Sequence, residues 1–581
     1  MPQATIIGVI PQYPIHSKQQ VFSKETITSL GLVYVMSQIE GHNIYIIDEN
    51  NYNGPVDPEG LPDHLELQKA RPVKMALFYG GMSISVPRLY SVAQQYQQLG
   101  VVTIAGGKHV ENMPMEALTS GIDIIVHGDG EKVMQPIVDA IIGKDGNIIE
   151  GYKRNLEQIL GLSFFGNNGE YVFTGERSPM TAEELSGLKD PNIELIESIE
   201  KRWSTIPISW GVGCNHGCEF CAVKDKYRKR GIEKLLNQVE SAIDLGYYRF
   251  FLVDDHAAQE SDSSIEMFAA LGDFLRERKP KKRVTITTQI RIDKADNDEL
   301  LGAMRYAGVT TVCVGYESPI DEELKAMNKG VTVKKLVERS RKLAKNFYIH
   351  GMFIFGYPTF KDSKYKSDLT LEEKTKRYRQ FFRKGRIDTI QVFNAVPLAG
   401  TELREKLDRE GRLIPLSQAG WDKYDGGFLC YDSTPEGIDP RRLQDTPIEL
   451  MERKYMGNAL GKVLNYGRWI NWTANTLGFP LRFSTSYVKN FFSNLTKKEK
   501  SFFEERVSPL GNIFYTPLKK AWKAIKRDWR TTFCNAVAGK IIGKWKSIYR
   551  KSNYSSILEK LRQRTKGYSL KTERKQYDAL E

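Results

Sequence analysis

Cysteine is scarce in this sequence, and long apolar runs are missing. The chain of 581 residues contains six cysteines, too few for the disulfide framework of a small secreted fold. No uninterrupted apolar stretch reaches the length of about 18 residues that a membrane-spanning helix needs. The N-terminus has neither a basic segment nor a small-residue cleavage site, so we expect no signal peptide. These absences predict a cytoplasmic protein.

The composition is typical of a globular protein, and the excess charge is confined to one end. Hydrophobic residues make up 41% and charged residues 27% of a chain long enough for roughly two to four domains. Residues 497–581 contain 22 Lys and Arg against 8 Asp and Glu, while the rest contains 62 against 63. The C-terminal tail therefore carries the whole net charge of +13.

Residues 1–145 alternate between short apolar runs and helical patterns. Such alternation predicts a parallel sheet with helices on both faces, as in Rossmann-like domains. Ligands of these sheets lie at the carboxyl ends of the strands, where this sequence has glycine-rich turns. The expected strands are residues 5–10, 44–47, 75–79, 101–105 and 122–126.

A second alternating series occupies residues 204–440. Its six strand candidates predict a partial (β/α)6 TIM-type barrel, in which the functional residues follow the strands. Residues 146–203 are expected to be a linker with a small hairpin, and residues 441–581 a mostly helical, basic C-terminal domain. The fold class is therefore α/β. The expected barrel strands are 207–211, 249–253, 284–288, 311–315, 350–355 and 389–396.

Three of the cysteines crowd together directly after the first barrel strand. Cys214, Cys218 and Cys221 lie within eight residues, and the neighbouring Gly213 and Gly217 permit a tight turn. Three thiolates can hold a four-iron cluster and leave one iron open, an arrangement that structural clusters usually avoid. A zinc site is the alternative. It is less favoured, because structural zinc sites usually take four ligands in two separated pairs.

The Cys-x3-Cys-x2-Cys spacing, with Phe220 before the last cysteine, resembles the signature of the radical S-adenosylmethionine (SAM) superfamily. The resemblance implies a [4Fe-4S] cluster whose open iron chelates SAM. It also implies reductive cleavage of SAM to a 5′-deoxyadenosyl radical, which removes hydrogen from an unactivated carbon. An external electron donor such as flavodoxin or ferredoxin is implied as well. No catalytic residue is assigned beyond the cluster, because the radical performs the first step.

Residues 204–415 contain further matches to that superfamily, each at the end of an expected strand. The resemblance implies that they bind SAM, but plainer readings exist. Asp is common at helix N-caps, and an Arg that can pair with the SAM carboxylate can equally form a structural ion pair. A Glu at the end of an apolar strand is harder to explain as surface decoration. The candidates are Asp254, Asp255, Arg291, Glu317 and Gly356.

The N-terminal domain resembles the cobalamin-binding domain that precedes the barrel in many radical SAM enzymes. The Asp-x-His-x-x-Gly motif that places a histidine on cobalt in many such domains is missing. His109 is the candidate cobalamin-pocket residue. Histidine-off binding and a vestigial, empty domain both remain open. The resembling pieces are Gly31-Leu-Val-Tyr34, Glu40-Gly-His42, Gly80-Gly-Met-Ser83, Gly106-Gly-Lys-His109 and Gly128-Asp-Gly-Glu131.

The basic tail contains an amphipathic pattern in which Leu518, Trp522, Ile525 and Trp529 share one helical face opposite Lys and Arg. A cationic helix with tryptophan on its apolar face suits an anionic membrane surface. This predicts peripheral association with the inner face of the membrane, and a lipid or membrane-associated substrate. The apolar faces could instead pack on the barrel. Nucleic acid is less favoured, because no recognisable RNA-binding module accompanies the tail.

The sequence thus predicts a radical SAM enzyme that modifies an unactivated carbon. Methyl transfer is expected if cobalamin binds; otherwise the reaction would be cyclisation, carbon–carbon coupling or rearrangement. A different class, an iron–sulfur electron-transfer or sensor protein, is the competing interpretation. The SAM-site candidates at successive strand ends argue against that class.

Overall fold

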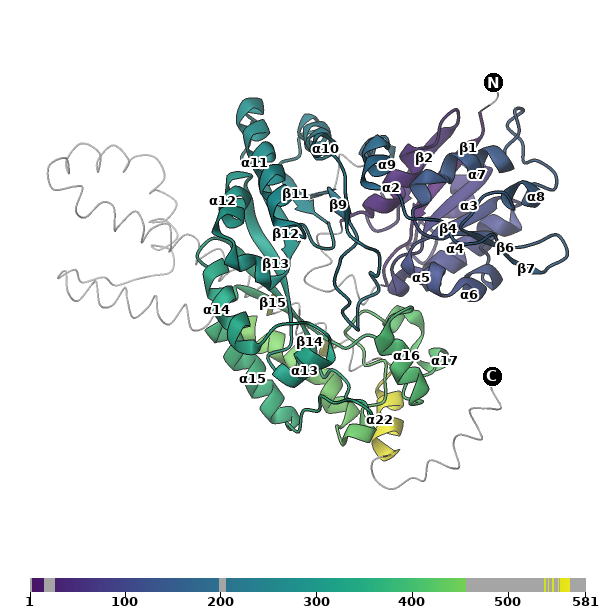
Figure 1. The fold of residues 1–581 in the computed structure, drawn as a ribbon. Helices are drawn as coiled ribbons and strands as arrows, with labels where there is room; N and C mark the ends of the chain where they lie inside the picture. Colours follow the sequence, from purple (N-terminus) through teal and green to yellow (C-terminus); the bar gives the residue numbers. More distant parts are fainter. Residues whose placement is uncertain are drawn as a thin grey trace, which may run out of the picture. The chain divides into compact units, whose positions relative to one another are not determined.

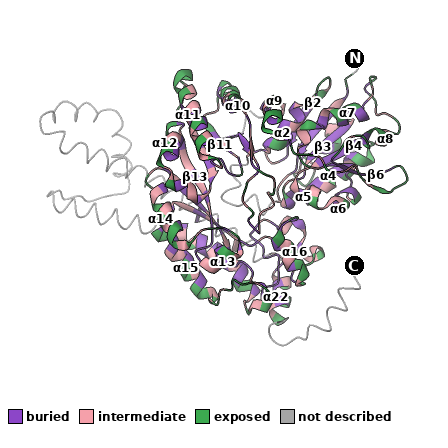
Figure 2. Cartoon of the chain, in the orientation of Figure 1, coloured by how far each residue is buried: buried purple, intermediate pink, exposed green. Residues whose placement is uncertain are grey.

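A computed structural model describes residues 3–14, 27–197 and 205–455, together with some residues between 538 and 564. Two β-sheets dominate the described chain, one built from the N-terminal part and one from the central part (Figure 1). Both sheets belong to one compact unit. Buried residues follow the strands of both sheets, and exposed residues lie mainly on the helices and loops (Figure 2).

The N-terminal sheet has five parallel strands in the order β2-β1-β3-β4-β5. Helices cover both of its faces. Ile7 and Val9 of β1 pack in one core with Leu89 of helix α4 (Val86–Gln98). Gly8, between them, faces Met36 of helix α2 (Leu30–Ser37). The strands are β1 Thr5–Ile10, β2 Asn43–Asp48, β3 Met75–Tyr79, β4 Val102–Gly106 and β5 Ile124–Val126.

The segment expected to be a linker partly belongs to this sheet. Strands β6 (Leu162–Phe165) and β7 (Tyr171–Phe173) form the small hairpin that the sequence indicated. However, β6 pairs antiparallel with β5, so the hairpin extends the N-terminal sheet at its edge. Turn-forming residues within 146–203 were enough to predict the hairpin. Its attachment to the sheet depends on β5, which lies outside that segment, so local signals did not predict it.

The central sheet has six parallel strands that follow one another in chain order. Among the described residues the first strand, β8, and the last, β15, do not pair, so the sheet is a partial barrel as predicted. Buried and half-buried residues alternate along β12 and β14, which is the pattern of strands with two unlike faces. The strands are β8 Ile206–Ile208, β11 Arg249–Leu252, β12 Thr285–Ile290, β13 Val309–Glu317, β14 Tyr348–Phe355 and β15 Thr389–Asn394.

Helices follow the barrel strands and complete the repeating strand–helix order. The connecting helices are α10 Ile232–Asp244, α11 Ser261–Arg278, α12 Asp298–Tyr306, α13 Asp321–Ala326, α14 Val333–Leu343, α15 Leu371–Lys384 and α16 Glu402–Arg409. Six parallel strands with helical connections place the strand carboxyl ends on one side of the barrel.

The described C-terminal part is helical, in agreement with the predicted helical region. Residues 440–455 are helical, and helix α22 spans Tyr554–Arg564. Ion pairs of 3.2 Å between Arg441 and Glu559 and of 3.0 Å between Arg562 and Asp439 join these segments. The amphipathic stretch from Leu518 to Trp529 lies outside the described residues. Among the described helices none is long and apolar enough to cross a membrane.

Candidate functional site

The three clustered cysteines lie on one loop whose base is closed by a short ladder. Strands β9 (Gly211–Val212) and β10 (Arg228–Lys229) pair antiparallel, so the chain between them forms a closed loop, here called the cysteine loop (residues 213–227). Inside it the Cys214 N–H donates to the Asp225 carbonyl at 2.9 Å. Cys218 is buried, and Cys214 and Cys221 are half-buried. The predicted ligands therefore share one compact loop at the end of the first barrel strand.

Gly213 is required for the shape of this loop. Its φ is +81°, and a Cβ there would lie 2.5 Å from the Lys226 carbonyl oxygen and 2.7 Å from that of Asp225. Any side chain would therefore meet backbone atoms that cannot move aside, in a conformation that favours glycine. The cysteine loop crosses over itself at this point, which brings Cys214 next to Asp225.

The chemistry of the cysteine loop fits an iron–sulfur cluster better than a single metal ion. Among the described residues no three His, Cys, Asp or Glu side chains converge as a single-ion site requires. A cubane places each thiolate on a different iron, so its ligands need not converge on one point. Cys313 lies on β13 and Cys430 is buried elsewhere, so neither completes a four-cysteine set in this loop. Burial raises the pKa of the Cys214 and Cys221 thiols, and a bound metal centre would offset this cost.

Asp254 supports the cysteine loop instead of facing a ligand. Its Oδ1 accepts the Trp210 N–H at 2.9 Å, and its Oδ2 accepts the Gly211 N–H at 2.8 Å. The side chain is 2% exposed, and burial raises its pKa to about 6. Both carboxylate oxygens thus bind the backbone that leads into the cysteines, and the assignment of Asp254 to SAM stays a prediction. Asp255 is exposed and accepts the Gly213 N–H at 3.1 Å.

Arg291 and Glu317 lie at the ends of neighbouring strands, as predicted. Arg291 follows β12; its Nε donates to Asp293 at 3.1 Å, and its Nη2 donates to the Lys329 carbonyl at 3.2 Å. Glu317 ends β13, and its Oε1 accepts a hydrogen bond of 2.8 Å from Lys329 Nζ. Lys329 is a residue that the sequence analysis missed. The only signal was its place in an Asn-Lys-Gly turn, and such a turn by itself indicates no contact with a strand end.

Gly356 follows β14, and close packing against the C-terminal segment explains why a glycine stands at this position. A Cβ at this position would lie 2.3 Å from Cδ1 of Leu443, on the helical segment 440–455. The Tyr431 hydroxyl donates to the Gly356 carbonyl. Gly356 thus lets the C-terminal segment approach the barrel, and the expectation that it lines the SAM site gains no support from these contacts.

His109 takes part in a network of hydrogen bonds and ring contacts at the edge of the N-terminal sheet. Its Nδ1 lies 2.9 Å from Ser83 Oγ, and its Nε2 lies 3.4 Å from Glu116 Oε1. Its ring meets the Trp421 ring edge-on at 4.5 Å, and Trp421 Nε1 donates to the same Glu116 carboxylate. Both ring nitrogens are therefore engaged. These partners all lie in folded polypeptide, and the assignment of His109 to a cobalamin pocket stays a prediction.

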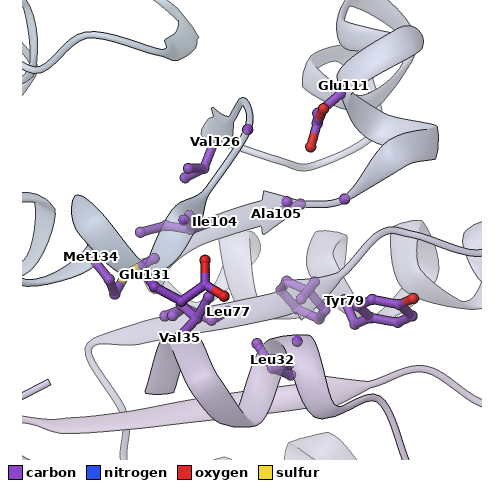
Figure 3. A pocket seen from close by; sticks show the side chains of 16 residues that line it. Leu32, Val35, Leu77, Tyr79, Ile104, Ala105, Glu111, Val126, Glu131 and Met134 are labelled. Atoms are coloured by element: carbon purple, nitrogen blue, oxygen red, sulfur yellow. The ribbon is translucent and has the colours of Figure 1, made fainter. Parts of the chain in front are cut away.

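A mainly apolar pocket lies at the carboxyl ends of β3, β4 and β5 and reaches helix α2 (Figure 3). Its volume is about 630 Å³, including space open to solvent. Figure 3 shows the Glu131 carboxyl group among apolar side chains and Glu111 apart from them on its own helix, and burial raises the pKa of both. Gly31 leaves its side of the pocket open, because a Cβ there would meet only Ser29 Oγ at 3.9 Å. The lining includes Leu32, Val35, Leu77, Tyr79, Ile104 and Met134.

Two ion pairs join the end of this N-terminal sheet to the cysteine loop and its base. Lys108, which follows β4, pairs with Asp225 at 2.8 Å. Asp129, which follows β5, pairs with Arg228 at 2.6 Å. Lys108 and Asp129 stand in the two turns whose Gly106, Gly107 and Gly128 line the pocket. The sequence did not indicate these partners, which are about 100 residues apart.

A parallel partial barrel with a three-cysteine loop after its first strand defines a class of iron–sulfur enzymes with an open cluster position. Residues 208–371 match the family described as the radical SAM superfamily. The barrel of this chain therefore carries the sequence of the radical SAM superfamily. The [4Fe-4S] cluster and SAM, which the sequence predicted as cofactors, are confirmed by these similarities.

Curated relatives cover most of the chain at low identity. An uncharacterized methyltransferase of Pyrococcus horikoshii is 25% identical over 68% of this chain and 81% of its own length. Bacteriochlorophyllide d C-8(2)-methyltransferase of Chlorobaculum tepidum is 23% identical over 68% of this chain and 78% of its own. Both matches extend well beyond the barrel of about 240 residues expected between 204 and 440.

A solved structure has a similar fold over nearly the whole chain. The cobalamin-dependent S-adenosylmethionine radical enzyme OxsB, with aqua-cobalamin and SAM bound, matches 98% of this chain and 85% of its own length. The TM-score is 0.58, at 12% sequence identity. At this identity the match shows the fold. The fold class predicted from the sequence, a Rossmann-like N-terminal domain and a radical SAM barrel, is therefore confirmed.

Proposed function

We propose that this protein is a cobalamin-dependent radical SAM methyltransferase that methylates an unactivated carbon. The observation that carries the proposal is the joining of the N-terminal pocket to the cysteine loop. Asp225 lies within that loop and Arg228 at its base, and their partners Lys108 and Asp129 stand at the pocket. Two cofactors that act on one substrate need such a fixed relation.

The pocket residues fit part of a large, mostly uncharged group. Cobalamin combines an amide-rich macrocycle with a heteroaromatic tail, and the pocket offers apolar walls and glycine-lined turns at the strand ends. Burial raises the pKa of both Glu111 and Glu131, and their carboxyl groups would offer hydrogen-bonding oxygens to the amides of the macrocycle. No histidine lines this pocket among the described residues. The proposal is therefore histidine-off binding.

The bound cofactors would supply a carbon-centred radical from SAM and a transferable methyl group from cobalamin. The chain's own residues then have three tasks. Cys214, Cys218 and Cys221 hold the cluster. Asp254 and Gly213 fix the backbone on which the first cysteine stands. The ion pairs of Lys108 and Arg228 keep the two cofactor regions together.

Methyltransferases among the relatives support methyl transfer, while an anaerobic magnesium-protoporphyrin IX monomethyl ester cyclase of Rubrivivax gelatinosus, 25% identical over 75% of this chain, keeps cyclisation as the alternative. Two proteins that each match 68% of this chain are named methyltransferases, and one of them is named for action on a bacteriochlorophyllide. Their names do not define one substrate, so the substrate class is left to experiment. An external one-electron donor such as flavodoxin or ferredoxin belongs to the proposal, because nothing in the radical chemistry supplies the first electron.

Three measurements test this function in order. Cluster-loaded protein with SAM and dithionite should release 5′-deoxyadenosine, and Cys218→Ala should release none. Protein incubated with hydroxocobalamin should keep corrin absorbance after desalting. Isotope-labelled methyl from SAM should then appear in an acceptor supplied from a cell extract. Release of 5′-deoxyadenosine without corrin binding would refute the methyltransferase and favour cyclisation, coupling or rearrangement. Absence of 5′-deoxyadenosine would refute the assignment of this protein as a radical SAM enzyme.

A further inference from the structure

A short turn after helix α13 lies against the cysteine loop at three points. The Glu219 N–H donates to the Met327 carbonyl at 3.3 Å, and Asn328 Nδ2 donates to the Gly217 carbonyl at 2.9 Å. Lys329 Nζ lies 6.0 Å from the centre of the Phe220 ring. Gly217 and Glu219 flank Cys218, and Phe220 precedes Cys221. The turn 327–329 therefore fixes the part of the loop that carries two of the three cluster ligands.

The Lys329 ammonium is buried and is paired with Glu317 at the end of β13. The two side chains are 8% and 10% exposed and lie 2.8 Å apart. Gly315 makes room for the pair, because a Cβ there would lie 2.4 Å from Glu317 Oε1 and 3.2 Å from Lys329 Nζ. A buried charge pair depends strongly on each partner, since loss of one leaves the other uncompensated.

Glu317 adopts an unusual backbone conformation at this point. Its φ is +61°, and the pairing of β13 with β14 shifts register between Gly315 and Glu317. A non-glycine residue in the left-handed region costs on the order of 1 kcal/mol and persists only where its surroundings impose it. Here the bulge turns the carboxylate toward Lys329. Arg291, at the end of β12, donates to the Lys329 carbonyl at 3.2 Å, so the same residue joins both strand ends.

We propose that Lys329 is a positioning residue for SAM. Its ammonium holds the Glu317 carboxylate in place and its carbonyl orients Arg291, while the turn that carries it is fixed to the cysteine loop. A carboxylate and a guanidinium at adjacent strand ends suit the ammonium or hydroxyl groups and the carboxylate of SAM. Lys329 thus couples the geometry of the cluster to that of the SAM site. The inference rests on SAM binding at the cluster, and it does not depend on cobalamin or on methyl transfer.

The chain offers a matched control for this idea. Lys374 on α15 pairs with Glu323 on α13 at 2.9 Å, and both side chains are buried, at 3% and 4% exposure. Lys374→Met therefore removes a buried cation from a similar pair, but the contacts of that pair do not include the cysteine loop. Comparison of Lys329→Met with Lys374→Met separates a positioning role from a general cost of breaking a buried ion pair.

The test is SAM binding to full-length, cluster-loaded protein without cobalamin or methyl acceptor. SAM would be titrated against the EPR spectrum of the reduced cluster, and bound iron would be counted in each sample. Lys329→Met should weaken SAM binding at least about tenfold at unchanged iron content, since a charge-assisted contact of this kind is worth about 1.5–3 kcal/mol. Lys329→Arg, which keeps the charge, should recover most of the affinity. Lys374→Met should bind SAM like the wild type.

Wild-type SAM affinity in Lys329→Met would overturn the proposal, and so would an equal loss in Lys374→Met. If Lys329→Met does not load the cluster, Lys329→Gln replaces it in the same titration, and wild-type affinity there overturns the proposal as well. Failure of methyl transfer in separate assays would leave the titration unaffected. The two proposals therefore fail independently.

Discussion

The Arg228 guanidinium binds the Asp129 carboxylate through both terminal nitrogens, at 2.6 and 3.2 Å. Asp129 also accepts the Met180 N–H at 2.7 Å. Burial of Asp129 favours the protonated form, but these hydrogen bonds outweigh it and lower the pKa of the carboxyl. The pair joins the end of β5 to β10, and β10 is one of the two strands that close the cysteine loop. A bidentate pair fixes orientation as well as distance.

The Arg228–Asp129 pair should matter for transfer between cofactors more than for SAM cleavage. Asp129→Asn and Arg228→Lys each remove the bidentate geometry, and we expect methyl transfer to fall at least about tenfold, in line with the cost of breaking a largely buried pair. Release of 5′-deoxyadenosine should stay within about threefold of the wild type, because the pair does not touch the cysteines. Product analysis by mass spectrometry measures both quantities. An equal fall of both would show that the pair supports the cluster instead.

Gly213→Ala should prevent cluster assembly. The new Cβ would press on the carbonyl oxygens of Lys226 and Asp225, so the cysteine loop could not close. Gly246→Ala is the control, since Gly246 has a similar φ of +88° but a Cβ there would meet nothing within 4 Å. Iron and sulfide content after reconstitution is the readout. We expect little bound iron in Gly213→Ala and near wild-type iron in Gly246→Ala. Full loading of Gly213→Ala would contradict the loop geometry.

Asp254 should make its own contribution to the pH dependence of stability. Burial raises its pKa to about 6 in the folded state, from its ordinary value of 3.8. Between these values the folded form holds a proton that the unfolded form has released. The contribution of this group to stability is therefore present at low pH and is lost as the pH rises through 6, by an amount on the order of 1–3 kcal/mol.

Urea unfolding of wild type and Asp254→Asn at several values between pH 4 and pH 7 tests this sign. The difference in unfolding free energy between the two proteins should shift in favour of the variant as the pH rises. Asp255→Asn serves as the exposed neighbour, with a smaller change expected. A pH-independent difference for Asp254→Asn would show that this carboxyl does not titrate in that range.

The basic tail should bind anionic membranes if its amphipathic pattern forms a surface helix. The full-length protein should float with vesicles that contain anionic lipid and not with zwitterionic vesicles, and added salt should weaken the binding. Trp522→Ser combined with Trp529→Ser should reduce flotation several-fold, because it removes the apolar anchors and keeps the charge. Failure of the wild-type protein to float would remove the membrane proposal and, with it, the reason for a lipid substrate.

Much of this architecture was predictable because the signals are local. Apolar runs of four to eight residues separated by helical patterns marked both sheets, and the strands formed within a few residues of the expected positions. The spacing of Cys214, Cys218 and Cys221 specified the cluster chemistry, since ligand type and spacing lie within one loop. The hairpin β6–β7 was found as a hairpin, but its place at the sheet edge depends on β5.

Individual roles at the strand ends were decided by the tertiary structure. Asp254, Gly356 and His109 all occupy the expected turns, yet each contacts other parts of the protein. Asp254 binds backbone N–H groups, Gly356 lies against Leu443, and His109 contacts both Ser83 and Glu116. Lys329 gained importance only because the turn 327–329 lies against the cysteine loop. Sequence by itself determined the strands, the barrel and the three thiols, since these depend on short-range patterns. The folded structure decided which polar groups have partners, because a hydrogen bond depends on atoms that the chain brings together from distant positions.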